Sequence, residues 1–140
     1  FLANYADGLS DLPLDDLVAS FRRKNAVATF ASVVPAHSFH LVNSDADDMV
    51  NSIKPMQGTD MAINGGYFAL RQEIFDYLRE GEELVEQPFR RLMEKRLLST
   101  YRHYGYWQAM DTFKDKISLD RIEARGDCPW MLWRNARQGA

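Results

Sequence analysis

Two aspartates in this 140-residue chain stand where carboxylates often do chemistry. Asp7 follows an apolar run expected to form a strand and precedes Gly8, and Asp111 follows a second expected strand and precedes a helix. Because ligands gather at the carboxyl ends of strands in open α/β sheets, the two carboxylates can converge on a hard cation such as Mg²⁺. Taken singly, each aspartate is more typical of a helix cap or a turn.

A lysine and a glycine pair are the next candidates. Lys54 precedes Pro55 at the end of an apolar strand, where its ammonium can meet a phosphate as a point charge, although a solvated strand-end lysine is the commoner case. Gly65 and Gly66 interrupt another expected strand, beside Asn64. Such a pair indicates either the close approach of a ligand, which Asn64 can hydrogen-bond, or a simple β-bulge.

The remaining polar and aromatic residues favour structural roles. His37 and His40 lack an evident third ligand, so zinc is not expected, and His103 is expected to be structural or exposed. The basic residues of the expected helix 86–96 indicate a solvated face. An aromatic cluster is more typical of a core than of a stacking platform; its members are Tyr101, Tyr104, Tyr106 and Trp107.

These residues must be positioned by alternating strands and helices. Apolar periodicity predicts a helix carrying Leu14, Leu17 and Phe21, capped by Ser10 or Asp11. Further helices are expected at 71–79, 86–96 and 112–125, and strands at 1–5, 26–34, 38–43, 49–53, 61–70, 97–103 and 104–110. The alternation predicts an α/β class with a layered sheet, in one domain or part of one, and the apolar tail 128–133 is expected to pack back on it.

Composition narrows the class of protein. Hydrophobic residues are 46% and charged residues 26%, as in ordinary globular proteins, and a net charge of −3 gives no reason to expect a nucleic-acid partner. No apolar run approaches the ~20 residues that a bilayer requires, so no membrane partner is expected. The single cysteine, Cys128, fits a cytoplasmic protein. The opening at Phe1–Tyr5 resembles a strand already in progress, so upstream sequence is expected.

Taken in order, five motifs resemble those of the sugar-1-phosphate nucleotidyltransferases, most nearly the glucose-1-phosphate cytidylyltransferases. Tyr5-Ala6-Asp7-Gly8 resembles the family's Tyr-Gly-Asp-Gly, and Lys54-Pro55 the end of its Glu-Lys-Pro. The segment 63–68 matches Ile-Asn-Gly-Gly-Phe-Phe, the segment 107–112 resembles Trp-Gln-Pro-Met-Asp-Thr, and the segment 124–133 resembles the family's proline- and tryptophan-containing tail. The resemblance covers essentially the whole chain.

The resemblance implies a layered α/β/α nucleotidyltransferase fold, Rossmann-like and GT-A-like, with a mixed sheet. Residues 1–140 would be its C-terminal portion, because the Gly-rich loop and nearby lysine that bind the nucleoside triphosphate are not in this sequence. The reaction would transfer a nucleotidyl group, expected from CTP, to a sugar-1-phosphate, expected to be glucose-1-phosphate, giving a nucleotide-sugar and pyrophosphate. The isolated chain is expected to be inactive, and a homo-oligomer is allowed.

The resemblance also implies roles for single residues. Asp7 and Asp111 would hold the catalytic Mg²⁺, and Lys54 would hold the sugar phosphate. The sugar would be bound by the glycine pair and its neighbours, which are Asn64, Gly65, Gly66 and Trp107.

Three departures from the family pattern put the exact sugar in question. Ala6 replaces a glycine, Ile53 replaces the glutamate before the lysine, and Gln87 replaces the glutamate before Pro88. Two other readings stay open. One is a non-catalytic sugar-phosphate-binding or regulatory module of the same fold, and the other is an interaction domain whose apolar tail docks a partner.

Overall fold

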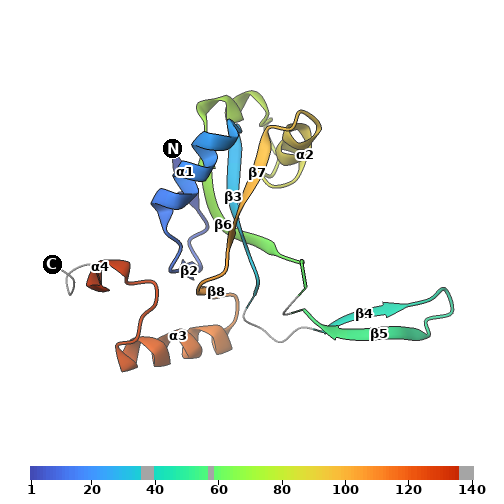
Figure 1. Cartoon of the computed structure of the whole chain (residues 1–140), viewed down its shortest axis with the longest axis vertical. Helices are drawn as coiled ribbons and strands as arrows, with labels where there is room; N and C mark the ends of the chain where they lie inside the picture. The colour runs from blue at the N-terminus through green and yellow to red at the C-terminus, as the bar shows by residue number, and fades with distance from the viewer. Residues whose placement is uncertain (36–39, 57–58, 136–140) are drawn as a thin grey trace.

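The main sheet of the protein has four strands in the order β1-β6-β3-β7. The structure is a computed structural model that describes residues 1–35, 40–56 and 59–135. The strands are β1 (Leu2–Asn4), β6 (Ile63–Leu70), β3 (Ala28–Val33) and β7 (Leu98–His103). β6 pairs antiparallel with both β1 and β3, whereas β3 pairs parallel with β7. The predicted mixed sheet is therefore confirmed (Figure 1).

Helices cover both faces of this sheet. Successive side chains of a strand point to opposite faces. From β3, Ala31 packs with Leu17 of α1 (Leu14–Lys24) on one face, whereas Ala28 packs with Leu92 of α2 (Gln87–Glu94) on the other. The 3₁₀ helix η1 (Gln72–Asp76) adds Ile74 to the α2 side. The layers are therefore α/β/α, as the resemblance implied.

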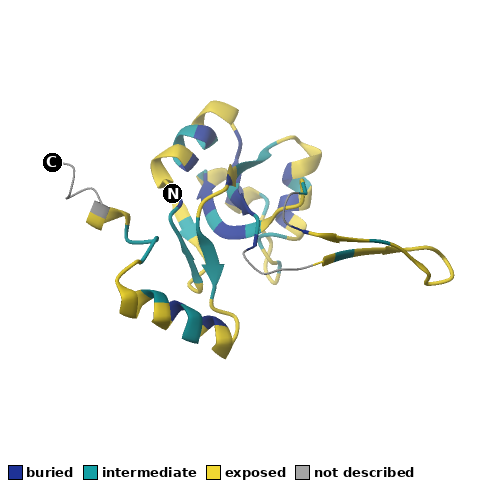
Figure 2. Ribbon diagram, turned by 60° about the horizontal axis from the view of Figure 1, so that its bottom comes forward, coloured by how far each residue is buried: buried dark blue, intermediate teal, exposed yellow. Residues whose placement is uncertain are grey.

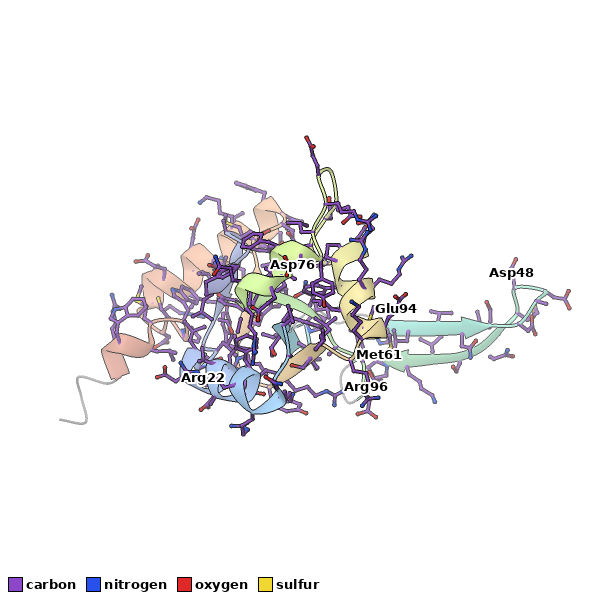
Figure 3. The ribbon with its side chains drawn as sticks, turned by 90° about the horizontal axis from the view of Figure 1, so that it is seen from above. Arg22, Asp48, Met61, Asp76, Glu94 and Arg96 are labelled. Atoms are coloured by element: carbon purple, nitrogen blue, oxygen red, sulfur yellow. The ribbon has the colours of Figure 1, made fainter. Side chains whose placement is uncertain are left out.

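Two smaller two-stranded sheets extend the body. We call the first the ribbon: β2 (Gly8–Ser10) pairs antiparallel with β8 (Trp107–Ala109). We call the second the arm: β4 (His40–Ser44) pairs antiparallel with β5 (Val50–Pro55). The ribbon lies below the main sheet in Figure 1, whereas the arm projects away from it. In Figure 3, Asp48 marks the far tip of the arm and Met61 lies near its base.

The C-terminal segment runs along the ribbon side of the molecule. α3 (Phe113–Arg125) begins after Thr112 and ends at Gly126, whose φ of 77° is the left-handed conformation expected of a helix-terminating glycine. A short helix, α4 (Leu132–Asn135), follows. The Tyr106 and Trp130 rings lie 5.7 Å apart, so the first part of the tail packs back on the body as predicted, whereas Leu132 and Trp133 are exposed. None of the helices in the described part of the chain is long and apolar enough to cross a membrane.

Several predicted elements differ from those observed. The strand predicted at 1–5 is limited to β1, which lies at the edge of the main sheet, and Leu2 is 49% exposed. The predicted helix 71–79 is only the short η1, and the strand predicted at 104–110 is limited to β8. The predicted strand 38–43 begins, in the described residues, at His40; residues 36–39, which include His37, lie outside them.

The cap predicted for α1 is also wrong. The helix begins after Pro13, which gives it no side-chain cap. The Ser10 hydroxyl instead accepts a hydrogen bond from the Leu12 N–H at 3.1 Å, and the Asp11 carboxylate contacts His103. Both side chains therefore hold the ribbon rather than the helix.

Candidate functional site

At one end of the ribbon, the backbones of the two candidate metal aspartates lie close together. Gly8 pairs with Ala109, and the Met110 N–H donates to the Asp7 carbonyl at 2.9 Å. Asp7 therefore faces Met110 across the ladder, and Asp111 is the next residue along. Both aspartates are exposed, so their carboxylates are solvated and open to a ligand.

The ribbon is fastened to β6 by two side chains. The Tyr67 hydroxyl donates to the Gly8 carbonyl at 2.7 Å, and the Trp107 indole Nε1–H donates to the Gly65 carbonyl at 2.8 Å. Burial raises the pKa of the Tyr67 hydroxyl, which favours its protonated, hydrogen-bond-donating form. The strand that leads to Asp111 is thereby held against the strand that carries the glycine pair.

The glycine pair forms a β-bulge, so that interpretation of the sequence is confirmed. The register of β3 against β6 passes from Phe30↔Phe68 to Ser32↔Asn64, which leaves extra residues on β6. Gly66 has a φ of 74°, and a Cβ there would lie 2.7 Å from the Tyr5 ring. The Gly66 carbonyl accepts from the Tyr5 N–H at 2.8 Å. Only glycine permits this close approach of the chain that leads into Asp7.

Asn64 and Gly65 complete the bulge. The Asn64 Oδ1 accepts a hydrogen bond from the Gly66 N–H at 3.0 Å, which fixes the amide in the bulge. A Cβ on Gly65 would lie 2.8 Å from Val33 Cγ1 and 3.4 Å from the Trp107 Nε1. The pair therefore allows Trp107 and β3 to approach β6, and the amide group of Asn64 has a structural partner of its own.

Asp111 is also fixed by the helix that follows it. Thr112 caps α3, and its hydroxyl accepts from the Asp115 N–H at 3.2 Å. The Asp115 Oδ2 in turn accepts from the Thr112 N–H at 2.9 Å, which completes a capping box. Asp111 thus lies at a strand-to-helix junction whose backbone is held on both sides.

A cleft of about 470 Å³ opens beside Asp111. Trp107 and Ile63 form part of its wall, so it adjoins the glycine-pair segment. Its lining also contains Lys114, an exposed residue in the first turn of α3 that sequence reasoning missed. The sequence did carry a signal for Lys114, because a cation in the first turn of a helix is disfavoured by the helix dipole and is therefore unexpected there.

Lys54 lies elsewhere, on the arm. It pairs with Leu41 of β4 near the base of the hairpin and is exposed. It is not among the described residues that line the cleft beside Asp111. Ile53, which replaces the family's glutamate, is 61% exposed and faces Val42 across the arm.

Two expectations about surrounding residues are corrected. Tyr104 is 77% exposed, so the aromatic cluster does not enter a core as a unit. Arg91 is not part of a solvated face: its guanidinium pairs with the Glu82 carboxylate and donates to the Tyr77 carbonyl at 2.7 Å. The hydrogen bond from Arg91 lowers the pKa of Glu82 to about 2.

The donor set at the ribbon end fits magnesium better than zinc. No group of three or more His, Cys, Asp or Glu that could hold a metal occurs among the described residues. Two exposed carboxylates are an incomplete shell for zinc, whereas Mg²⁺ is commonly bound by one or two carboxylates together with substrate phosphates and water. Asp7 and Asp111 are the residues that would hold it.

Known proteins resemble the chain over nearly its whole length. It is 33% identical over 135 residues to a Bacillus subtilis (strain 168) protein described as a glucose-1-phosphate cytidylyltransferase, and 29% identical over 134 residues to the glucose-1-phosphate cytidylyltransferase of Salmonella typhi. Each match covers 95% of this chain but only 53% and 52% of those proteins. The chain therefore spans about half the length of the curated relatives it matches.

A solved structure shares the fold. A Bacillus anthracis protein described as a glucose-1-phosphate thymidylyltransferase, crystallised with a sucrose, superposes with a TM-score of 0.56 at 14% identity, over 88% of this chain and 52% of that one. No family model matches the chain. The resemblance deduced from the motifs is thus confirmed, and the half-length matches are consistent with the C-terminal half of a nucleotidyltransferase.

Proposed function

We propose that this chain, similar to half of a glucose-1-phosphate cytidylyltransferase, supplies the metal and sugar-phosphate side of a sugar-1-phosphate nucleotidyltransferase site. The observation that carries the proposal is the Met110 N–H to Asp7 carbonyl bond, which puts Asp7 and Asp111 at one end of the ribbon. The 33% identity to the Bacillus subtilis relative supports the reaction class.

The reaction needs positioning rather than covalent participation by the protein. A phosphate oxygen of the sugar-1-phosphate attacks the α-phosphorus of the nucleoside triphosphate, the bond to the β-phosphate oxygen breaks, and pyrophosphate leaves with that electron pair. Catalysis of such a displacement rests on alignment and on neutralising phosphate charge. A bound Mg²⁺ would supply part of that charge neutralisation.

The residues of this chain have distinct roles in the proposal. Asp7 and Asp111 would hold the metal, which would neutralise phosphate charge, and Lys54 would hold the phosphate of the sugar as a point charge. The bulge at Gly65 and Gly66, with Asn64 and Trp107, shapes the wall against which the sugar is bound. We further propose CTP and glucose-1-phosphate as substrates, following the relatives' names.

The nucleotide-binding part would lie outside these 140 residues. Triphosphates in this class of enzyme are held by backbone N–H groups of a Gly-rich loop and a lysine. Because that loop does not occur in the sequence, we expect no pyrophosphate release from CTP and glucose-1-phosphate by residues 1–140 alone. Clear release by the purified chain would contradict this division of the site.

Metal binding by the chain itself tests the proposal most directly. Mn²⁺ replaces Mg²⁺ at carboxylate sites and broadens nearby NMR signals, so titration should broaden the amides around Asp7 and Asp111 first. Asp111→Asn removes one charged ligand and should weaken Mn²⁺ binding by about tenfold or more. Asp48→Asn is the matched control, because Asp48 is an exposed aspartate at the tip of the arm. Equal weakening in both variants would show only a general loss of charge and would overturn the assignment.

A further inference from the structure

The ribbon has a second end, opposite the candidate metal aspartates, and it is closed by Asp11. This residue follows β2 directly, and its N–H donates to the Tyr106 carbonyl at 3.1 Å, which continues the ladder beyond Ser10↔Trp107. At about 3.3 Å of rise per residue, Asp11 lies roughly 13 Å along the strand from Asp7. It is therefore too far away to be a ligand of the same metal.

The Asp11 carboxylate contacts the main sheet at His103. The His103 Nε2 lies 2.7 Å from the Asp11 Oδ1, and His103 is the last residue of β7. The histidine side chain is 8% exposed and the aspartate side chain 31%. The imidazole is therefore buried while the carboxylate is partly exposed, and hydrogen bonds to a charged carboxylate are stronger than those between neutral groups. The bond between Asp11 and His103 joins the ribbon to the parallel pair β3–β7, whereas Tyr67 and Trp107 join it to β6.

The surroundings of this pair leave little room for movement. A Cβ on Gly105 would lie 2.3 Å from the Asp11 Oδ1 and 2.7 Å from the His103 Cε1, so the loop between β7 and β8 fits closely around the pair. The Ser10 hydroxyl donates to the Tyr106 carbonyl at 2.8 Å on the other side. The loop that leads into β8 is thus held at its beginning and at its end.

We propose that Asp11 and His103 are positioning residues, which set the placement of the ribbon and thereby the separation of Asp7 and Asp111. The ribbon strands are only three residues long, so a shift at the Asp11 end is transmitted to the other end rather than absorbed. The inference rests on the proposed function, since it assigns a purpose to the placement of those two aspartates. Outer partners of this kind change metal affinity without contacting the metal.

Two readouts on residues 1–140 test the pair. The first is hydrogen exchange of the Met110 amide, which closes the aspartate end of the ribbon, measured relative to the Ala31 amide of the main sheet. The second is the affinity for Mn²⁺, followed by NMR broadening at Asp7 and Asp111. His103→Leu keeps the bulk of the ring and removes its donor. It should speed Met110 exchange about tenfold and weaken Mn²⁺ binding about tenfold.

A rescue variant and a control separate positioning from general stability. In His103→Gln the amide nitrogen can replace Nε2, so both readouts should return toward wild type. Glu82→Gln weakens another part-buried ion pair, with Arg91, which fastens the segment before α2 and does not touch the ribbon. It should lower the melting temperature while leaving the Met110 exchange ratio and the Mn²⁺ affinity unchanged. If His103→Leu does not fold, Asp11→Asn should give the same changes at smaller size.

The outcomes distinguish this inference from the function on which it rests. If Mn²⁺ causes no broadening at Asp7 and Asp111 in the wild-type chain, the proposed metal site is wrong. The exchange rate of the Met110 amide relative to that of Ala31 would then be the one test of whether Asp11 and His103 anchor the ribbon. Wild-type binding that stays unchanged in His103→Leu and in Asp11→Asn would overturn the positioning role. Equal exchange ratios in His103→Leu and Glu82→Gln would do the same.

Discussion

The ribbon and the arm are both two-stranded antiparallel ladders outside the main sheet, yet their surroundings differ. All six residues of the ribbon strands are half-buried, whereas nine of the eleven arm-strand residues are exposed (Figure 2). The ribbon is joined to the main sheet through Tyr67, Trp107 and His103. Among the described residues, no side-chain hydrogen bond or ion pair joins the arm to the main sheet.

This difference in support means that the two parts of the proposed site, the metal aspartates and the phosphate-binding lysine, are held with different firmness. A lone two-stranded hairpin is marginally stable in water, so the arm derives its order from its own pairing and from the chain that enters and leaves it. Asp7 and Asp111 belong to the supported ladder and Lys54 to the unsupported one. We therefore expect the metal side of the site to be preorganised before substrate arrives, and the lysine side to be set when substrate or another part of the protein meets the arm.

The largest effect on the supported ladder should come from Gly66→Ala. The substitution forces alanine into a φ of 74° and drives its Cβ to 2.7 Å from the Tyr5 ring. Strain and clash together should lower the free energy of unfolding by about 2–4 kcal/mol, measured by urea denaturation.

Gly81→Ala separates strain from clash. Gly81 has nearly the same backbone angle, a φ of 79°, but a Cβ there would meet nothing within 4 Å. It should cost about 1 kcal/mol. Equal losses for the two glycine variants would mean that contact with Tyr5 does not hold the bulge, and the ribbon would lose one of its supports.

A smaller effect is expected from Trp107→Phe. The ring bulk remains, but the Gly65 carbonyl loses the donor that lies 2.8 Å away. Leaving that carbonyl without its partner should lower the free energy of unfolding by about 1–2 kcal/mol, measured by thermal and urea unfolding. The control is Trp133→Phe, because Trp133 is 60% exposed and should tolerate the change within about 0.5 kcal/mol. Similar values for the two variants would argue that the indole bond does not support the ribbon.

The smallest effect is expected on the arm. Val42→Thr replaces a side chain that is 60% exposed and should change the free energy of unfolding by less than about 0.5 kcal/mol. The same substitution at Val33, which is 2% exposed in β3, buries a hydroxyl and should cost about 1–3 kcal/mol. A large loss at Val42 in the urea denaturation of the chain would show that the arm is packed against a neighbour.

Sequence patterns predicted the parts of the fold that local chemistry determines. β3 and β6 are apolar runs, Gly126 ends α3 and the glycine pair forms a bulge, because each follows from propensity or from backbone sterics. The order of the motifs led to Asp7 and Asp111, whose neighbouring positions follow from pairing between β2 and β8.

What the sequence did not predict depends on contacts between distant segments. β2 was not predicted, because three residues with one large apolar side chain carry no periodic signal. The predicted helix 71–79 is cut short where Arg91 of α2 binds the Tyr77 carbonyl. The hydrogen bond between Asp11 and His103 joins residues 92 positions apart, whereas the local pattern favoured Asp11 as a helix cap.

The strand order of the main sheet has a consequence for how the chain reaches its native state. Leu2 of the edge strand pairs with Ala69, and Ala28 of the central strand pairs with both Leu70 and Leu98. Each of these pairings must close a long loop before it gains any contact energy, and topologies rich in such non-local pairings fold over milliseconds to seconds rather than microseconds. During synthesis, β3 stays without its parallel neighbour until the last residue of β7 has left the ribosome, so the central strand of the sheet is among the last to be completed.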